Sequence, residues 1–155
     1  MFLNPLLPKF VNEVHRITLI LVMDGLSRMI GLAKRQGALK GVKVSPSNHL
    51  SHVFFVDDVS LHGANSMEEW TKFYDIISNF FSASGMDISK NKSCFIAVDG
   101  ELDKSIGELF SIEVLPFEKG FNYLRFILKP NFYRFQDWVW LWDRVDQKIG
   151  LWSYR

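Results

Sequence analysis

The chain has 155 residues, of which 48% are hydrophobic and 23% are charged, and its formal net charge is +1. This length suits one domain, and this composition excludes a disordered chain. A net charge so close to zero gives no argument for nucleic-acid binding through overall charge, so such binding would depend on local patches. Aromatic residues make up 15% of the chain. This fraction predicts either an unusually aromatic core or a surface that packs against something else.

The single cysteine, Cys94, excludes an intrachain disulfide and a cysteine-based zinc site. The longest apolar run, Ile17 to Met23, is too short to span a bilayer, and residues 1–5 lack the basic and apolar regions of a signal peptide. We therefore expect a soluble, intracellular protein, in the nucleus or the cytoplasm, with no membrane partner. His52 and His62 flank the predicted hairpin described below and could lie near each other, but the histidines lack the spacing of a metal site.

The first third of the chain predicts a lead-in, a helix and a strand. Residues 1–16 contain two prolines and no clear period, so we expect them to be irregular. Apolar residues then recur at helical spacing from 17 to about 36, and Gly37 is the expected stop. Residues 41–45 alternate between apolar and polar like a short strand, and a turn follows at Ser45 to Asn48.

Two adjacent carboxylates, Asp57 and Asp58, interrupt an apolar run that predicts strands at 50–56 and 59–63. Aspartate is depleted in strands, and a buried charge is costly unless it is paired or bound to a metal. The pair therefore predicts a tight turn that projects both carboxylates from the tip of a hairpin. Such a tip could bind a hard divalent cation such as Mg²⁺, or it could be an ordinary turn with solvated aspartates.

Ser66 to Glu69 has the spacing of a capping box, in which the Ser66 hydroxyl accepts from the Glu69 N–H and the Glu69 carboxylate reaches back to the Ser66 N–H. A helix to about Ser84 is expected to follow, and Gly85 is the expected stop. The apolar stripe of this helix predicts core residues at Trp70, Phe73, Ile77, Phe80 and Phe81.

The second half of the chain predicts shorter elements. Strand patterns at 86–88 and 94–98 flank a polar segment, a short helix is expected at 102–110, and a strand at 121–128. The last segment, 135–154, predicts an amphipathic helix with one apolar face: Trp138, Leu141, Trp142, Val145, Ile149 and Trp152. The element order implies an α+β domain in which helices pack on a small antiparallel sheet.

Several stretches together resemble a known family. Leu50 to Leu61, with the run Phe-Val-Asp-Asp, resembles the aromatic-x-Asp-Asp motif of reverse transcriptases from LINE-type, non-LTR retrotransposons of the plant type. Residues 21–30 look like the helix after the motif that contacts template and nucleotide, and residues 84–93 look like the family's Ser-Gly-Leu-x-Ile-Asn-x-x-Lys-Ser segment. Residues 123–128 look like its Tyr-Leu-Gly-x-Pro-Leu primer-grip strand, and Trp138 onward is similar to the start of the thumb helix. Five motifs in register make the resemblance specific.

This resemblance covers residues 17–155 and implies an organisation. Residues 1–16 would be an irregular lead-in, residues 17–128 a partial polymerase palm with helices on one face of its sheet, and residues 129–155 the start of the thumb helix. The chain would thus be a fragment of an RNA-directed DNA polymerase. The partners of the intact family are an RNA template and a DNA primer, and the missing fingers and thumb segments are further expected partners of this chain.

The chemistry implied by the resemblance is two-metal nucleotidyl transfer with Mg²⁺, or Mn²⁺ in its place. One ion would activate the primer 3′ hydroxyl, and the other would stabilise the leaving pyrophosphate. Asp57 would be the main metal ligand of this motif and Asp58 the weaker one. Phe55 stands where the family has Tyr or Phe near the primer end.

Three further residues take roles through the resemblance. Lys92 corresponds to a lysine proposed to protonate the leaving group, and it fits a solvated loop lysine equally well. Tyr123 and Leu124 would support the primer backbone.

The departures from the family predict that this chain is catalytically incomplete alone. The family's third aspartate lies on an earlier strand that would precede residue 1, and two adjacent carboxylates cannot alone hold two metals ~4 Å apart. The family's Gln-Gly-x-Pro-Leu-Ser-Pro should fall at residues 10–16, where the sequence differs. Arg125 and Ile127 stand where the family has Gly and Pro.

Two other hypotheses remain open. The chain could be a binding module without catalysis, which recruits a protein through exposed aromatic residues or binds the nucleic-acid backbone through its basic residues. Those basic residues are Lys34, Arg35, Lys40, Lys43, Lys90 and Lys92. The chain could also be a non-functional remnant of a retroelement, unstable without its missing strands.

Overall fold

The chain divides into two compact units, Met1–Val114 and Leu115–Arg155. The computed structural model describes residues 1–3, 5–6, 13–56, 58–97, 101–123, 126–131 and 133–153. The predicted site residues Asp57 and Leu124 lie outside the described residues, as does Arg125.

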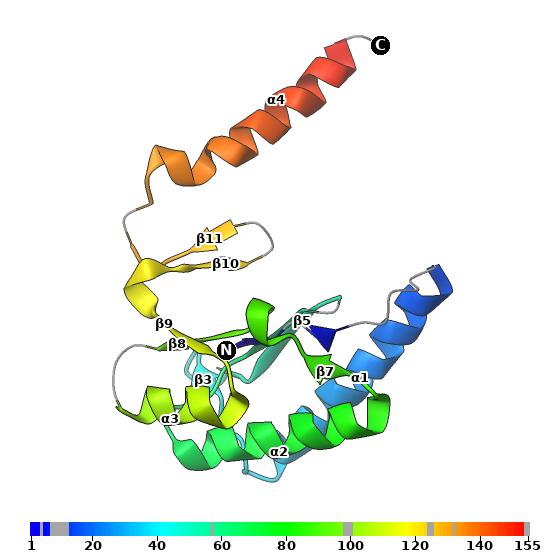
Figure 1. Ribbon diagram of the computed structural model, residues 1–155, viewed down its shortest axis with the longest axis vertical. Coiled ribbons are helices and arrows are strands. Elements are labelled where there is room, and N and C mark those ends of the chain that lie inside the picture. Colours follow the sequence, from blue (N-terminus) through cyan, green and yellow to red (C-terminus); the bar gives the residue numbers. More distant parts are fainter. Residues whose placement is uncertain are drawn as a thin grey trace. The chain divides into compact units, whose positions relative to one another are not determined.

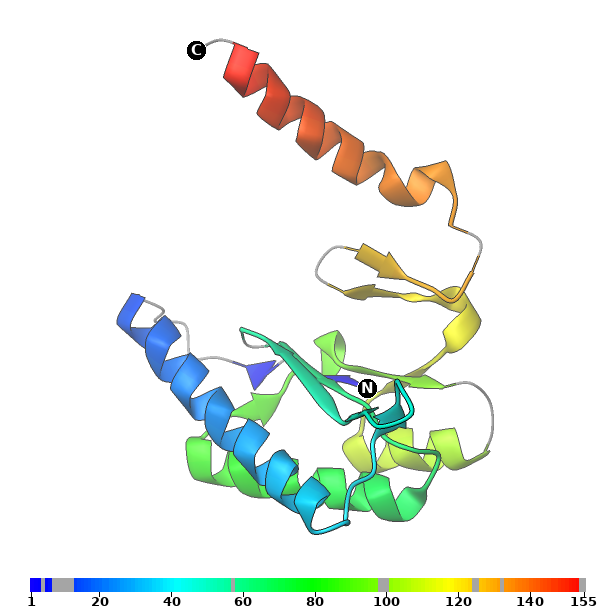
Figure 2. The same ribbon diagram turned by 180° about the vertical axis from the view of Figure 1, so that it is seen from behind.

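The first unit contains helices on one face of a small sheet (Figures 1 and 2). Its helices are α1 (Glu13–Arg35), α2 (Met67–Ser84) and α3 (Glu101–Phe110), with a 3-10 turn η1 (Lys90–Lys92). Its strands are β1 (Phe2–Leu3), β2 (Pro5–Leu6), β3 (Val42–Lys43), β4 (His49–Leu50), β5 (His52–Phe55), β6 (Asp58–Leu61), β7 (Asp87–Ile88), β8 (Cys94–Ala97) and β9 (Glu113–Pro116). The boundary between the two units falls inside β9, after Val114. The predicted α+β class is confirmed at this level.

The main sheet has the strand order β5-β6-β1-β8-β9. β6 pairs antiparallel with β5 and with β1, and β1 pairs antiparallel with β8. Helices α1 and α2 lie on the same face of this sheet (Figure 2). The opposite face of this sheet carries none of the three helices (Figure 1).

The core of the first unit is strongly aromatic. All five residues of the predicted α2 stripe are buried, which confirms that prediction. The Trp70 ring packs edge-on against Phe95 at a centroid distance of 5.1 Å and lies 5.2 Å from Phe73. Part of the aromatic content thus fills the core, because the buried side chains include Trp70, Phe73, Phe80, Phe81, Phe95 and Phe110.

Helix α1 buries a narrower stripe than its composition predicts. Its buried positions are Leu19, Met23, Leu26 and Ile30. Ile20 and Leu21 belong to the predicted apolar pattern but are 57% and 67% exposed. A residue one or two positions from the buried stripe is rotated about 100–200° away from it, so these side chains face solvent.

The chain before residue 17 contains more structure than the predicted irregular lead-in. Helix α1 begins at Glu13, and β1 occupies the middle of the main sheet, between β6 and β8. Met1 is buried in the core beside it. A strand of two residues is too short for a period of two to be visible in the sequence, so only its pairing partners identify it.

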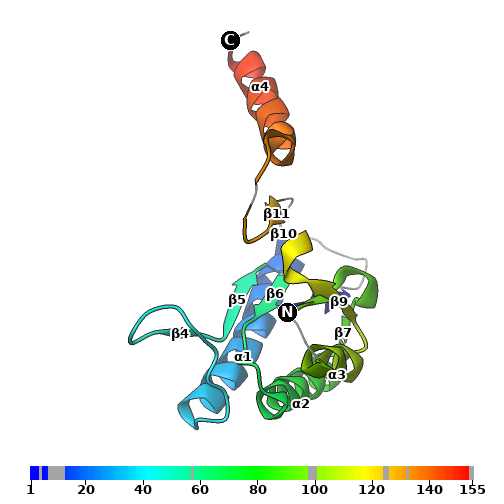
Figure 3. The same cartoon turned by 90° about the vertical axis from the view of Figure 1, so that its left-hand side faces the viewer.

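The predicted strand at 50–56 consists of two strands that change partner at Ser51. β4 pairs with β3 in a ribbon that projects from the edge of the unit, whereas β5 pairs with β6 (Figure 3). The Ser51 carbonyl accepts from the His62 N–H at 2.8 Å, so the backbone at the break is satisfied by the neighbouring strand.

The predicted capping box at α2 is wrong. Gly85 does end the helix with φ of +70°, as expected, but the Ser66 side chain makes no capping hydrogen bond. The Glu69 carboxylate accepts instead from the backbone N–H groups of Lys40, Gly41 and Ala64. Three donors from two loops satisfy this buried carboxylate better than the single N–H of Ser66 would.

The second unit contains a hairpin and a helix. Its elements are η2 (Phe117–Lys119), β10 (Phe121–Tyr123), β11 (Phe126–Leu128), η3 (Phe135–Trp138) and α4 (Val139–Ser153). The predicted single strand at 121–128 is wrong, because Phe121 pairs with Leu128 and Tyr123 with Phe126 in an antiparallel ribbon. The sequence between the two strands contains no Gly, Asn or Asp and therefore gives no hairpin signal.

Candidate functional site

The predicted hairpin around the two aspartates is present. In the β5–β6 register, Phe55 and Asp58 are the last opposite pair before the turn. Asp58 is the first residue of β6 and is half-buried. The geometry of Asp57 lies outside the described residues.

Phe55 and Asp58 lie on the sheet face that the helices leave uncovered. Directly opposite residues share a face, and successive residues alternate between faces. Phe54 and Val59 form the adjacent opposite pair and pack in the core on the helix side. Phe55 and Asp58 therefore point the other way, and the Phe55 side chain is 53% exposed. The hairpin thus presents an aromatic ring beside a carboxylate on an open sheet face.

The turn is strained at Val56. Its φ is +57°, in the left-handed region that β-branched residues rarely adopt. Such outliers cost about 1–3 kcal/mol and cluster at functional sites. The strain was not predicted from the sequence, since Val56 is read there as the end of a strand.

Replacing Val56 by asparagine is expected to stabilise the first unit by about 1 kcal/mol, because asparagine tolerates the left-handed region that valine resists. The free energy of unfolding in urea is the measurement. Val44→Asn is the control, since Val44 is another exposed valine and its φ is not positive. Equal effects of the two substitutions would show that the turn stores no strain.

The described residues do not complete a metal site at this hairpin. Among them, no group of three or more His, Cys, Asp or Glu side chains could hold a metal ion. The strand beside β6 is β1, and its two residues, Phe2 and Leu3, carry no carboxylate. A Mg²⁺ ion held by one or two carboxylates normally needs substrate phosphates for the rest of its shell. Metal binding by Asp57 and Asp58 therefore remains a prediction, and the described residues provide no third ligand for it.

The other predicted site residues are spread over both units. Lys92 ends the 3-10 turn η1 and is exposed, and its backbone N–H donates to the Ser89 carbonyl at 3.0 Å. Tyr123 belongs to β10 in the second unit, and Leu124 lies outside the described residues. The structure thus brings together Phe55 and Asp58 as an opposite pair.

His52 and His62 are held by serine hydroxyls. His52 contacts Ser27 Oγ through Nε2 at 2.9 Å and Ser51 Oγ through Nδ1 at 3.0 Å, and His62 Nε2 lies 3.0 Å from Ser60 Oγ. Burial lowers the pKa of both imidazoles, to about 4 for His62, and the amino terminus and then His52 further lower the His62 pKa. The two rings are thus electrostatically coupled across the hairpin, as their positions predict, and both are neutral near pH 7.

The amino terminus is a buried group that the sequence did not indicate. The Met1 nitrogen donates to the Leu61 carbonyl at 2.8 Å. Burial lowers the pKa of this amino group to about 5, and the nearby Cys94 has a smaller opposing effect. Burial also raises the Cys94 pKa, so the thiol is protonated near neutral pH. Only the pairing of β1 between β6 and β8 brings these groups together.

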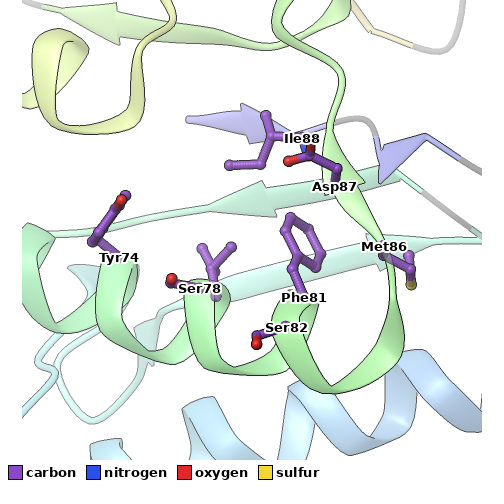
Figure 4. Close-up of a pocket in the computed structure, with 8 residues that line it drawn as sticks. Tyr74, Ser78, Phe81, Ser82, Met86, Asp87 and Ile88 are labelled. Carbon is purple, nitrogen blue, oxygen red and sulfur yellow. The ribbon is translucent and has the colours of Figure 1, made fainter.

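An open cleft of about 270 Å³ lies between α2 and β7 (Figure 4). Ile77, Phe81 and Ile88 contribute apolar walls, and the Tyr74 and Asp87 side chains contribute polar groups. Of the predicted site residues that the structure describes, none lines this cleft. It therefore contributes nothing to the candidate site at the hairpin.

Comparison with known proteins assigns no family. No protein-family model matches the chain, and neither a curated protein nor a solved structure matches it significantly. Within the described part of the chain, every helix is too short or too polar to cross a membrane.

Proposed function

We propose that this chain carries part of the palm of a reverse transcriptase from a LINE-type, non-LTR retroelement. The observation that supports this most is the β5–β6 hairpin, where Phe55 lies opposite Asp58 on the sheet face without helices. The family's motif has an aromatic residue and an aspartate at these positions.

The surrounding elements support the same proposal. The segment that resembles the helix before the Asp-Asp motif lies within α1, and the segment around Lys92 follows α2 as η1. Both belong to the unit that contains the hairpin. The segments that resemble the family's helix, Asp-Asp motif and lysine segment thus all lie in the first unit.

The open face of the hairpin would be the side that meets a primer–template duplex. An exposed aromatic ring can stack on a base or pack against a sugar, and such contacts contribute about 1–3 kcal/mol per base. The carboxylates beside it repel phosphate unless a cation lies between them. Binding by this chain is therefore expected to be weak.

Binding of a primer–template duplex at low salt tests the proposal. We expect Phe55→Ala to weaken binding about tenfold through loss of the aromatic contact. Leu32→Ala is the matched control, because Leu32 is an exposed apolar residue of α1, away from the hairpin. Equal affinities of the wild type and Phe55→Ala would contradict the assignment of this face.

The alternative of a binding module without catalysis has support in the exposed positions of Lys40 and Lys43, near the end of α1 and on β3. Lys34 is engaged, because its ammonium donates to the His49 carbonyl. Loss of binding in Lys40→Ser with Lys43→Ser, together with unchanged binding in Phe55→Ala, would favour this alternative. Phosphate contacts of this kind also weaken steeply with salt.

Primer extension by this chain alone is expected to be negligible with Mg²⁺ or Mn²⁺. The physical reason is that the described carboxylates do not complete a two-metal site. The measurement is incorporation of nucleotides on a primed RNA template. Robust extension that Asp57→Asn abolishes would overturn this expectation and would show that the chain supplies a complete site.

A further inference from the structure

Helix α4 carries an apolar stripe that no described residue covers. Trp142, Val145 and Ile149 are 57%, 42% and 56% exposed, and Trp138 continues the stripe at the end of η3. This confirms the apolar face predicted from the sequence as far as Ile149. A helix of 15 residues is marginal in water without packing on such a face.

The start of the helix is already packed within the second unit. The Trp140 ring lies edge-on to Phe126 at 5.0 Å, and Trp138 lies 5.4 Å from Tyr133. The Lys129 ammonium pairs with Asp137 just before the helix, which lowers the Asp137 pKa. These contacts fix the first turn against the β10–β11 hairpin. They engage one part of the Trp138 ring, which stays 37% exposed, and they leave Trp142, Val145 and Ile149 exposed.

The stripe has the spacing of a coiled-coil seam. Its positions 138, 142, 145 and 149 are separated by four, three and four residues, which is the alternation of d and a positions in a heptad repeat. Trp142 and Ile149 occupy a positions, and Trp138 and Val145 occupy d positions. This spacing matches packing against another helix.

We propose that the α4 stripe packs against the α4 helix of a second copy of this chain, in antiparallel orientation. In antiparallel pairs an a position faces a d position. Trp142 then faces Val145 of the second copy, and Trp138 faces Ile149 of the second copy. Each large ring thus meets a smaller β-branched side chain, the combination that fills a seam without voids. A parallel pair would instead stack Trp on Trp and leave a gap between the two Val145 side chains.

The flanking residues select the same register. Val139 and Asp146 occupy e positions, and Leu141 and Lys148 occupy g positions. In this register Lys148 lies beside Leu141 of the second copy, where its aliphatic stem covers apolar surface, and Asp146 lies beside Val139 of the second copy. A shift by one heptad places Lys148 against Lys148 and Asp146 against Asp146, which like-charge repulsion disfavours. The sizes of the seam side chains and the charges of the flanking residues therefore favour the same antiparallel register.

Sedimentation over a range of protein concentrations tests this pairing in the full chain. A seam of four layers belongs to the small, weak class of interfaces, so we expect dimers that form in the micromolar range. Val145→Glu is expected to weaken dimerisation at least about tenfold, because it buries an unpaired charge. Gln147→Glu on the outer face of α4 is the control and should leave it unchanged. A monomer at every concentration, or equal effects of the two substitutions, would overturn the proposal.

Disulfide trapping tests the orientation. With Cys94→Ser as background, chains carrying Trp142→Cys and chains carrying Val145→Cys are oxidised separately and as a mixture. The antiparallel register predicts cross-linking mainly in the mixture, between position 142 of one chain and position 145 of the other. Cross-linking of Val145→Cys chains with each other alone, at the same yield as in the mixture, would show a parallel pair and overturn the proposal.

Discussion

Replacing Glu69 by alanine is expected to lower the free energy of unfolding by about 4 kcal/mol, a loss found only for a few kinds of substitution. Glu69 is buried in the first turn of α2. Its Oε1 accepts from the N–H groups of Lys40 and Gly41, both at 2.7 Å, and its Oε2 accepts from the Ala64 N–H at 2.9 Å. Alanine would leave these three donors without their partner.

The three bonds join segments that are far apart in the sequence. Lys40 and Gly41 lie in the connection from α1 to β3, and Ala64 lies in the connection from β6 to α2. Gly41 has a φ of +75°, and a Cβ there would lie 2.4 Å from the Leu50 carbonyl oxygen. The carboxylate therefore holds a loop whose backbone conformation is specific and tightly packed. The Trp70 indole also donates to the Ala64 carbonyl at 3.0 Å, which fixes the second loop.

Glu68→Ala is the matched control for this prediction. Glu68 also lies in the first turn of α2 but is exposed, so its removal should cost less than about 0.5 kcal/mol. Glu69→Gln keeps one oxygen but turns an N–H₂ group toward one of the donors, and its cost should be intermediate. Urea unfolding of the three variants measures these differences. A loss for Glu69→Ala that equals the loss for Glu68→Ala would contradict the role given to Glu69.

The function of Glu69 shows what local sequence patterns cannot specify. The Ser-x-x-Glu spacing correctly marks the start of α2, since helix start signals act within a few residues. The actual partners of the carboxylate are two loops, and Lys40 lies 29 residues away. Sequence spacing carries no information on which distant backbone groups lack partners. The element was therefore predictable, whereas the interaction that stabilises it was not.

Strands with a local sequence signal were predicted, whereas strands that depend on pairing with distant segments were not. Strands β5 and β6 follow from an apolar run around two aspartates, and Gly37 and Gly85 correctly end α1 and α2. The short strand β1 and the hairpin of β10 and β11 depend on pairing with other segments, and their sequences lack the period or the turn residues that would reveal them. Strand β9 was not predicted for the same reason.

The candidate site was predictable only in part. The hairpin was predicted from the apolar run around the two aspartates. The prediction that Asp58 lies in the turn is wrong, because Asp58 begins β6 and pairs with Phe55. The positive φ of Val56 was not predicted, because valine at a turn gives no signal for it. The buried amino group of Met1 likewise depends on the position of β1 in the sheet, which only the fold determines.

Raising the pH from about 5 to about 8 is expected to stabilise the first unit by up to about 4 kcal/mol. The pKa of the Met1 amino group is about 5 in the fold, because of burial, against an ordinary value of 8.0. Between these values the unfolded chain binds a proton that the folded chain does not. The free energy of unfolding therefore rises as the pH increases from about 5 to about 8. It falls again when the pH is lowered through this range, because the unfolded chain then gains a proton that the folded chain does not.

His62 also makes the free energy of unfolding rise with pH, but over a lower pH range than the Met1 amino group. Its pKa falls from 6.5 to about 4, through burial, the amino terminus and then His52. Protonation of its imidazole in the unfolded chain thus favours unfolding between about pH 4 and 6.5. Because Met1 and His62 each disfavour a charge on the other, the two titrations are coupled and should appear as one broad transition.

The free energy of unfolding in urea, measured at several pH values, tests this prediction. Acetylation of the Met1 nitrogen removes the charge and keeps one N–H donor for the Leu61 carbonyl, so it should remove most of the slope between pH 5 and 8. His62→Asn should flatten the remaining slope below pH 6.5. A stability that is constant or falls from pH 5 to 8 in the unmodified chain would show that the amino group is solvated. In that case β1 would not occupy the centre of the sheet, since that position is what buries the amino group.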